Sequence, residues 1–207
     1  MDSYLVPARD ASAEIEVKRS RFLCRIARVE SEEAARAVIA EERRTHGTAG
    51  HHCSAFVLGP DATTTRSNDD GEPSGTAGPP ILDALQGAHL SDVVAVVTRW
   101  FGGTLLGTGG LVQAYGDATR AALRGAGVRR RELRQRLETT VDFSIAGRLE
   151  DQLRRIATVE VDYDTGLPRF RAAVTTADLE EVHTLILTAS NGHAQITELS
   201  PLWIDAD

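Results

Sequence analysis

The feature that most constrains this chain of 207 residues is a mostly apolar run, DVVAVVTRW (92–100), followed by a glycine-rich segment. A short apolar run bounded by turn signals is typical of a strand that is buried on both faces. The next ten residues, FGGTLLGTGG, contain five glycines, and LVQAYGDATRAALRGAG then has the period of a helix that ends at glycine. The sequence therefore predicts a strand over 92–100, a loop over 101–110 and a helix over 111–127.

This glycine-rich loop could bind an anion. Backbone N–H groups between a strand and a helix, together with the helix dipole, can hold a phosphate, and Arg99 would add a fixed charge. The nucleotide motifs are absent, because Thr108 stands where the P-loop has Lys and the glycines do not fit G-x-G-x-x-G. Alternatively, the glycines only permit positive φ and close helix packing. The candidate residues are Arg99, Gly102, Gly103, Gly107, Gly109 and Gly110.

A second candidate region is the polar stretch RSNDDGEPSGTAG (66–78). Its acids and hydroxyls suit a hard cation, a polar ligand or a protein partner. The spacing does not match an EF-hand, and Ser74 does not lie in a G-x-S-x-G nucleophile elbow. The alternative is a solvated turn whose acids cap the following helix. The candidate ligand-binding residues here are Ser67, Asp69, Asp70, Glu72, Ser74 and Thr76.

A third candidate region is His51, His52 and Cys53, at the start of the predicted strand 51–59. Strand alternation places His51 and Cys53 on one face and His52 on the other, so the three cannot share one metal ion, and no metal site is predicted. Cys53 could be a nucleophile, but no orienting partner is evident, and a buried small apolar role fits it better. His51 is the better candidate for a polar role.

The order of predicted elements divides the chain into two domains, 1–130 and 131–207. In the first, a hairpin over 14–29 precedes a helix capped by Ser31, and residues 60–80 are predicted to hold no regular element before a short helix opened by Pro79 and Pro80. The second has the order β-α-β-β-α-β of a ferredoxin-like domain. The predicted class is α+β.

Charge and composition narrow the function further. The net charge is −7, with 15 Lys and Arg against 16 Asp and Glu in residues 1–130, and 8 against 14 in residues 131–207. The acidic second half argues against tight nonspecific nucleic-acid binding there, and no DNA sequence specificity is expected. Two cysteines fit a reducing compartment, and no leader or membrane span is evident, so a cytoplasmic location is expected.

Four ordered segments resemble the signature of the IMPACT family, including its bacterial YigZ-like members: KRSRFLCRIARVESEEAARAVI, THGTAGHHCSAFVLG, RSNDDGEPSGTAGPPIL and VVAVVTRWFGGTLLGTGGLVQAYGDA. The resemblance implies a first domain like the second domain of ribosomal protein S-five. It also implies a second domain similar to one in elongation factor G. Trp100 replaces the usual Tyr, and Thr104 and Leu105 replace a common Ile-Lys, which removes a possible phosphate contact.

Three functions remain open. The resemblance favours a regulatory binding protein in translation, with a ribosome, RNA or translation factor as partner and the glycine-rich loop meeting phosphate. The second is an enzyme on a small phosphorylated or nucleotide substrate, with an acid of the 66–78 stretch as base or metal ligand and His51 assisting. The third is a scaffold whose acidic second half binds a basic protein. The sequence names no cofactor, and the enzyme is the less favoured alternative.

Overall fold

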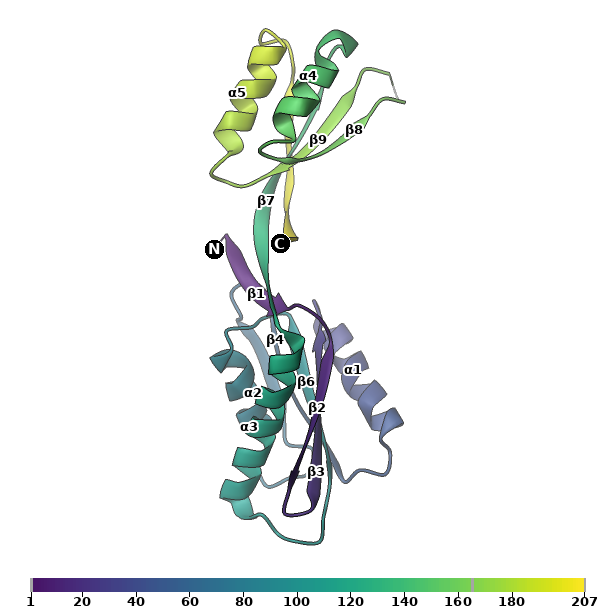
Figure 1. The fold of residues 1–207 in the computed structure, drawn as a ribbon, viewed down its shortest axis with the longest axis vertical. Helices are drawn as coiled ribbons and strands as arrows, with labels where there is room; N and C mark the ends of the chain where they lie inside the picture. The colour runs from purple at the N-terminus through teal and green to yellow at the C-terminus, as the bar shows by residue number, and fades with distance from the viewer. Residues whose placement is uncertain (1, 165, 207) are drawn as a thin grey trace. The chain divides into compact units, whose positions relative to one another are not determined.

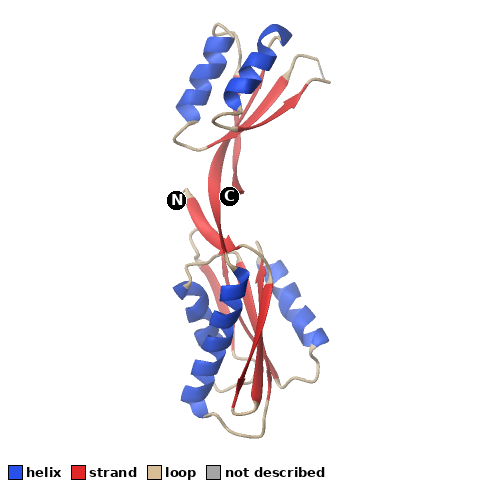
Figure 2. Cartoon of the chain, in the orientation of Figure 1, coloured by secondary structure: helices blue, strands red, loops and turns tan. Residues whose placement is uncertain are grey.

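Helices and strands are both present (Figures 1 and 2), and the strand pairs with a described register are antiparallel, which confirms the α+β class. The computed structural model describes residues 2–164 and 166–206. By its internal contacts the chain divides into two units, residues 3–130 and 131–206. Each unit has its own apolar core.

The first unit is an antiparallel sheet covered by helices on both faces. The strand order is β2-β3-β6-β4-β5. Figure 1 shows α2 and α3 on one face of this sheet and α1 on the other. The elements are β1 (Ser3–Pro7), β2 (Ala11–Val17), β3 (Ser20–Arg28), α1 (Glu32–Thr45), β4 (His51–Leu58), β5 (Thr64–Asn68), α2 (Gly78–Gly87), β6 (Val93–Trp100) and α3 (Gly107–Ala126).

The central strand β6 explains why both faces need helices. Val93, Ala95 and Val97 face the core beneath α2 and α3, whereas Val94 and Val96 face α1. Because side chains alternate along a strand, a run that is apolar on both faces requires cover on both. The predicted strand over 92–100 is therefore confirmed, with β6 starting at Val93.

The prediction that residues 60–80 hold no regular element is wrong, because β5 lies within them and α2 begins at Gly78. The β5 sequence, TTRSN, is polar on both faces and shows no alternation. Its polarity is consistent with its place at the end of the sheet, where among the described residues it pairs with β4 alone and its side chains are half-buried or exposed. A strand of this kind has almost no sequence signal.

The start of α1 agrees with the prediction from local sequence, whereas the start of α3 does not. Ser31 caps α1 as predicted, with its side chain accepting from the Ala34 N–H at 3.1 Å. Helix α3 ends before Gly127 as predicted, but it begins at Gly107 rather than at residue 111. The last three glycines of the glycine-rich loop therefore form the first turn of α3.

The second unit has the predicted β-α-β-β-α-β order. Strand β7 pairs with β9, β9 with β8, and β10 with β7. Leu149 and Leu153 of one helix and Val182 and Ile186 of the other pack on Phe170 in its core. The elements are β7 (Val128–Thr140), α4 (Phe143–Leu153), β8 (Thr158–Asp162), β9 (Arg169–Val174), α5 (Leu179–Ala189) and β10 (Ile196–Ala206).

Candidate functional site

A buried polar network joins three elements of the first unit. Arg99, at the end of β6, donates to the Glu72 carboxylate at 2.6 Å, and the Tyr115 hydroxyl of α3 donates to the same Oε1 at 2.6 Å. Arg99 and Glu72 are only 6% and 8% exposed, and Tyr115 is fully buried. The guanidinium also lies 5.4 Å from the Phe22 ring and 5.7 Å from the Phe101 ring. Its charge is therefore balanced within the fold.

Cys53 closes this network on the β4 side. Its thiol donates to the Asp69 carbonyl at 3.0 Å and lies 3.4 Å from the Tyr115 hydroxyl. Burial raises the pKa of Cys53 to about 12, and burial likewise raises the pKa of Tyr115. A thiol that holds its proton at neutral pH is a poor nucleophile. Cys53 is buried in the apolar core as predicted, but its thiol also takes part in the polar network.

The residues 69–78, which we call the acidic loop, satisfy their own polar groups. The Asp69 carboxylate accepts from the backbone N–H groups of Gly75, Ala77 and Gly78 at 2.8–3.0 Å. Burial alone would raise the pKa of Asp69, but these three hydrogen bonds lower it overall. Asp69 thus caps α2, although it lies eight residues before Ala77 in sequence. This agrees with the alternative interpretation of the stretch as a turn whose acids cap the following helix.

Asp70 and His51 are held by the same loop. Asp70 accepts from the His52 N–H at 2.6 Å and forms an ion pair with Arg43 of α1. The His51 Nδ1 lies 2.9 Å from the Asp70 carbonyl, and its Nε2 lies 3.9 Å from Glu72. The structure therefore brings together five of the predicted candidates: His51, Asp69, Asp70, Glu72 and Arg99.

The three hydroxyl candidates of this stretch have different positions. The Thr76 hydroxyl is buried and donates to the Pro73 carbonyl at 2.6 Å. Ser74 is exposed in the acidic loop, and Ser67 is exposed on β5. Neither serine lies in the buried network.

The glycine loop, residues 101–110, is open to solvent by contrast. Phe101 and Leu105 are 57% and 83% exposed. Leu106, the N-cap of α3, makes no side-chain capping bond, and Gly107, Thr108 and Gly109 in the first turn are exposed. Gly103 and Gly107 have φ of 86° and 75°, which glycine adopts without strain. Gly109 has open space around it.

Gly102 fixes this loop against a neighbouring hairpin. Its N–H donates to the Ser20 hydroxyl at 3.1 Å, and a Cβ at this position would lie 2.0 Å from the Arg19 carbonyl carbon. Figure 1 shows that the β2–β3 turn and the loop leading into α3 lie at the same end of the first unit. Only glycine allows this approach of the two backbones.

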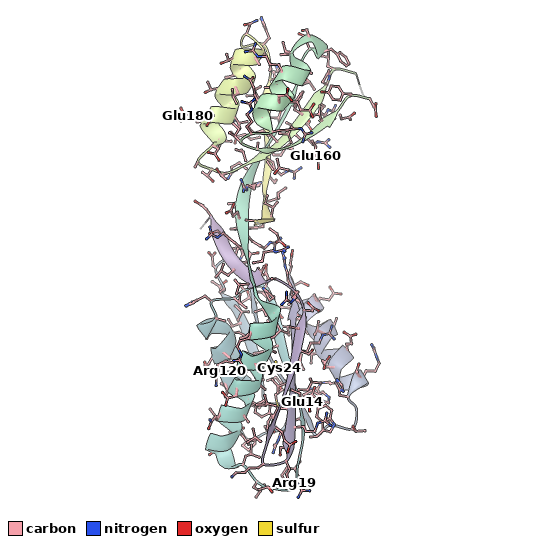
Figure 3. The ribbon with its side chains drawn as sticks, in the orientation of Figure 1. Glu14, Arg19, Cys24, Arg120, Glu160 and Glu180 are labelled. Carbon is pink, nitrogen blue, oxygen red and sulfur yellow. The ribbon has the colours of Figure 1, made fainter. Side chains whose placement is uncertain are left out.

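The hairpin turn itself adds residues that the sequence reasoning missed. Val17 pairs with Ser20, so Lys18 and Arg19 form a two-residue turn, with φ of 47° and 69°. Both side chains are exposed, and no ion pair between either of them and a carboxylate is found within the described residues. Figure 3 labels Arg19 at this end of the first unit. Arg21 follows, paired with Glu14 and stacked 4.8 Å from the Trp100 ring. In the sequence, this turn is indicated by the basic pair Lys18-Arg19, which lies between two runs of alternating polar and apolar residues.

Two negative observations concern residues 2–164 and 166–206. No cluster of three or more His, Cys, Asp or Glu side chains in these ranges could hold a metal ion. None of the helices in this part of the chain combines the length and the apolar character that a membrane crossing requires.

Comparisons with known proteins give the family. Residues 18–123 match the model of the Impact N-terminal domain. The chain is 36% identical over 200 residues to IMPACT family member YvyE of Bacillus subtilis, covering 96% of this chain and 92% of YvyE. It is 46% identical to IMPACT family member YigZ of Escherichia coli over 60% of this chain and 62% of YigZ.

The fold also has a solved relative. A crystal structure of a hypothetical protein, 35% identical, aligns with a TM-score of 0.69 over 97% of this chain and 98% of that one. The sequence match therefore extends over both units. The chain belongs to the IMPACT family.

Proposed function

We propose that this chain is a cytoplasmic binding protein that associates with RNA in connection with translation, through the end of the first unit formed by the β2–β3 turn and the glycine loop. The proposed contact residues are Lys18, Arg19, the backbone amides at Gly103, Gly107 and Gly109, and the exposed ring of Phe101. Proteins bind phosphate backbones with fixed cations and helix N-termini, and unpaired bases with aromatic faces.

The observation that carries this proposal is the turn at Lys18 and Arg19. A two-residue hairpin turn with both residues at positive φ is typically Asn-Gly, because other residues are strained there. Each strained residue costs roughly 1–3 kcal/mol. Two long cations in this conformation, next to uncapped helix amides, support a role in binding at this surface.

Arg99 and the acidic loop take a supporting part in this proposal. Arg99 is paired with Glu72, so it positions Phe101 and the end of β6 and offers no free charge to a ligand. Asp69 and Asp70 are engaged by backbone amides and Arg43. The phosphate contacts are therefore assigned to the hairpin and to the amides of the glycine loop.

The experiment replaces the turn by the residues that its geometry prefers. The double variant Lys18→Asn, Arg19→Gly should be more stable than the wild type, by about 1 kcal/mol, because the strain is relieved. It should also bind a fluorescein-labelled single-stranded RNA less tightly in an anisotropy titration. The slope of log affinity against log salt should fall by about 0.7 for each phosphate that the variant no longer neutralises.

Arg124→Asn is the matched control, because Arg124 is an exposed cation in the last turn of α3, far along the helix from the glycine loop. This variant should leave the RNA affinity unchanged. Equal RNA affinity in the wild type and the turn variant, or no binding by the wild type at about 50 mM salt, where phosphate contacts are strong, would overturn the proposal.

A second candidate is an enzyme on a small phosphorylated or nucleotide substrate. It is favoured by His51 alone, whose half-exposed ring lies 3.9 Å from the buried Glu72 carboxylate. A nucleotide at 100 times its dissociation constant would stabilise the protein by about 2.7 kcal/mol. A thermal-shift screen of nucleotides should show such a shift, abolished in His51→Ala, if this candidate is right. No shift with any nucleotide would eliminate it.

A further inference from the structure

A groove in the first unit lies between α1 and β5. Strand β5 is at the opposite edge of the sheet from the β2–β3 hairpin. Helix α1 packs on β6 and β4, so the α1 side of the sheet is left open at β5, whose other side is covered by α2. The groove has a volume of about 390 Å³. Its α1 wall is formed by Arg36, Ile39, Ala40 and Arg43, and its floor includes Phe56 and Arg66. We call it the basic groove.

The charge of the basic groove is opposite to that of the whole chain. None of its lining residues is acidic, in a protein of net charge −7. Arg36 and Arg66 share one carboxylate, Glu32, at 3.0 Å and 3.9 Å. Both guanidinium side chains are about two thirds exposed or more. Exposed pairs of this kind contribute little, so another carboxylate can replace Glu32 easily.

The backbone beside the groove is an unpaired sheet edge. Within the described residues β5 is the terminal strand and pairs only with β4. The Thr65 carbonyl accepts a hydrogen bond from the Arg66 guanidinium at 2.8 Å, which indicates that this carbonyl faces away from β4. Because backbone groups alternate in an antiparallel pair, Thr65 and Ser67 both present theirs at this edge. Such an edge is a template for another strand.

We propose that the β5 edge and the basic groove together bind an extended acidic segment of a partner protein. The segment adds to β5 as a sixth strand. One of its N–H groups replaces the Arg66 guanidinium as the hydrogen-bond donor to the Thr65 carbonyl. Its acidic side chains, at alternate positions, point into the groove and pair with Arg36 and Arg66, while Arg43 stays paired with Asp70. Strand addition of this kind obtains affinity from main-chain hydrogen bonds and specificity from alternate side chains.

Two features favour a peptide over a nucleic acid at this surface. The free edge offers alternating N–H and C=O groups at strand spacing, which a peptide backbone matches and a phosphate backbone does not. The groove also has apolar side chains, Ile39 and Phe56, between its arginines, and these suit aliphatic stems of Glu or neighbouring apolar residues. This surface is separate from the β2–β3 turn, so the proposal does not depend on RNA binding there.

The test uses the full chain and a fluorescein-labelled eight-residue peptide of alternating Glu and Val. This peptide should bind in an anisotropy titration, and in NMR spectra it should shift the amides of Thr65 and Ser67. The double variant Arg36→Glu, Arg66→Glu should weaken binding at least tenfold, whereas Arg44→Glu, an exposed neighbour on α1 outside the groove, should not. The corresponding Lys and Val peptide should not bind.

A second variant separates the edge from the charge. Thr65→Pro removes one outward N–H and leaves every arginine in place, and proline is tolerated on edge strands. It should weaken peptide binding while the melting temperature stays near that of the wild type. The proposal is overturned if the acidic peptide does not bind at about 1 mM, if the arginine variants bind it as well as the wild type, or if only RNA shifts the β5 amides.

Discussion

The acidic loop and the glycine loop occupy equivalent places in the fold, yet they differ in what they leave available. Each follows a strand and leads into a helix, β5 into α2 and β6 into α3. In the acidic loop, Asp69, Asp70 and Glu72 are bound by backbone amides, Arg43 and Arg99. In the glycine loop the helix amides are uncapped, and Phe101 and Leu105 are exposed. The charged residues of the acidic loop therefore stabilise the fold, whereas the glycine loop, which has no charged residues, leaves an open surface.

The largest effect should come from breaking the buried pair of the acidic loop. Glu72→Ala leaves Arg99 buried without a counter-charge and removes the acceptor of Tyr115. Removing one partner of a buried pair costs about 3–5 kcal/mol. Urea denaturation should show a loss of this size, while Ser74→Ala, an exposed change in the same loop, should stay within about 0.5 kcal/mol. A small loss for Glu72→Ala would mean that this network does not organise the loop.

The next effect should come from the one point where the glycine loop is structural. In Gly102→Ala the added Cβ meets the Arg19 backbone, which cannot move without distorting the β2–β3 turn. Overpacking of this kind costs roughly 3 kcal/mol. Circular dichroism melts would measure it. A variant as stable as the wild type would show that the hairpin and the glycine loop are not in close contact in solution.

A smaller and pH-dependent effect is expected from Asp69→Asn, about 1–3 kcal/mol at pH 7, because charged hydrogen bonds to three amides are weakened. The folded pKa of Asp69 lies below the reference value of 3.8, so the folded state favours the ionised form. Its contribution is therefore present above pH 3.8 and is lost as the pH falls through the lower folded pKa.

The measurement is the difference in unfolding free energy between wild type and Asp69→Asn across about pH 2–7, the range that brackets this titration. The difference should be constant near neutrality and should shrink in acid. Asp83→Asn, an exposed carboxylate on α2, is the control and should show no such trend. A difference that is independent of pH would exclude the carboxylate as the cap of α2.

The comparison also explains what the sequence could predict. The strand over 92–100 and the Ser31 cap depend on residues close in sequence, and both are confirmed. Capping of α2 by acids of the 66–78 stretch was one of the alternatives, but the choice of Asp69 depends on a loop folding back over eight residues, which composition does not encode. The start of α3 was missed because Gly107, Gly109 and Gly110 disfavour helix intrinsically, and the contacts of the folded unit override that preference.

Other features depend on contacts across the sheet. Strand β5 is defined only by its pairing with β4, and the basic groove only by the position of α1 beside it. Tyr115 is a further case, since its role requires Glu72, 43 residues away in sequence. The turn at Lys18 and Arg19 lacks the Asn or Gly that usually predicts a two-residue hairpin turn. The sequence therefore indicated the strands on either side of this turn and not the site between them.

The smallest expected effect tests whether the glycine loop is kept open for a ligand. Gly109 lies in the first turn of α3 with open space where a Cβ would lie, so Gly109→Ala should stabilise the protein by about 0.4–1 kcal/mol. Gly107→Ala, at a φ of 75°, should instead destabilise by about 1 kcal/mol. If Gly109→Ala gains stability and loses RNA affinity in the same titration, the open amides serve binding. Unchanged affinity would show that the ligand does not approach this turn, and would restrict the proposed contact to Lys18 and Arg19.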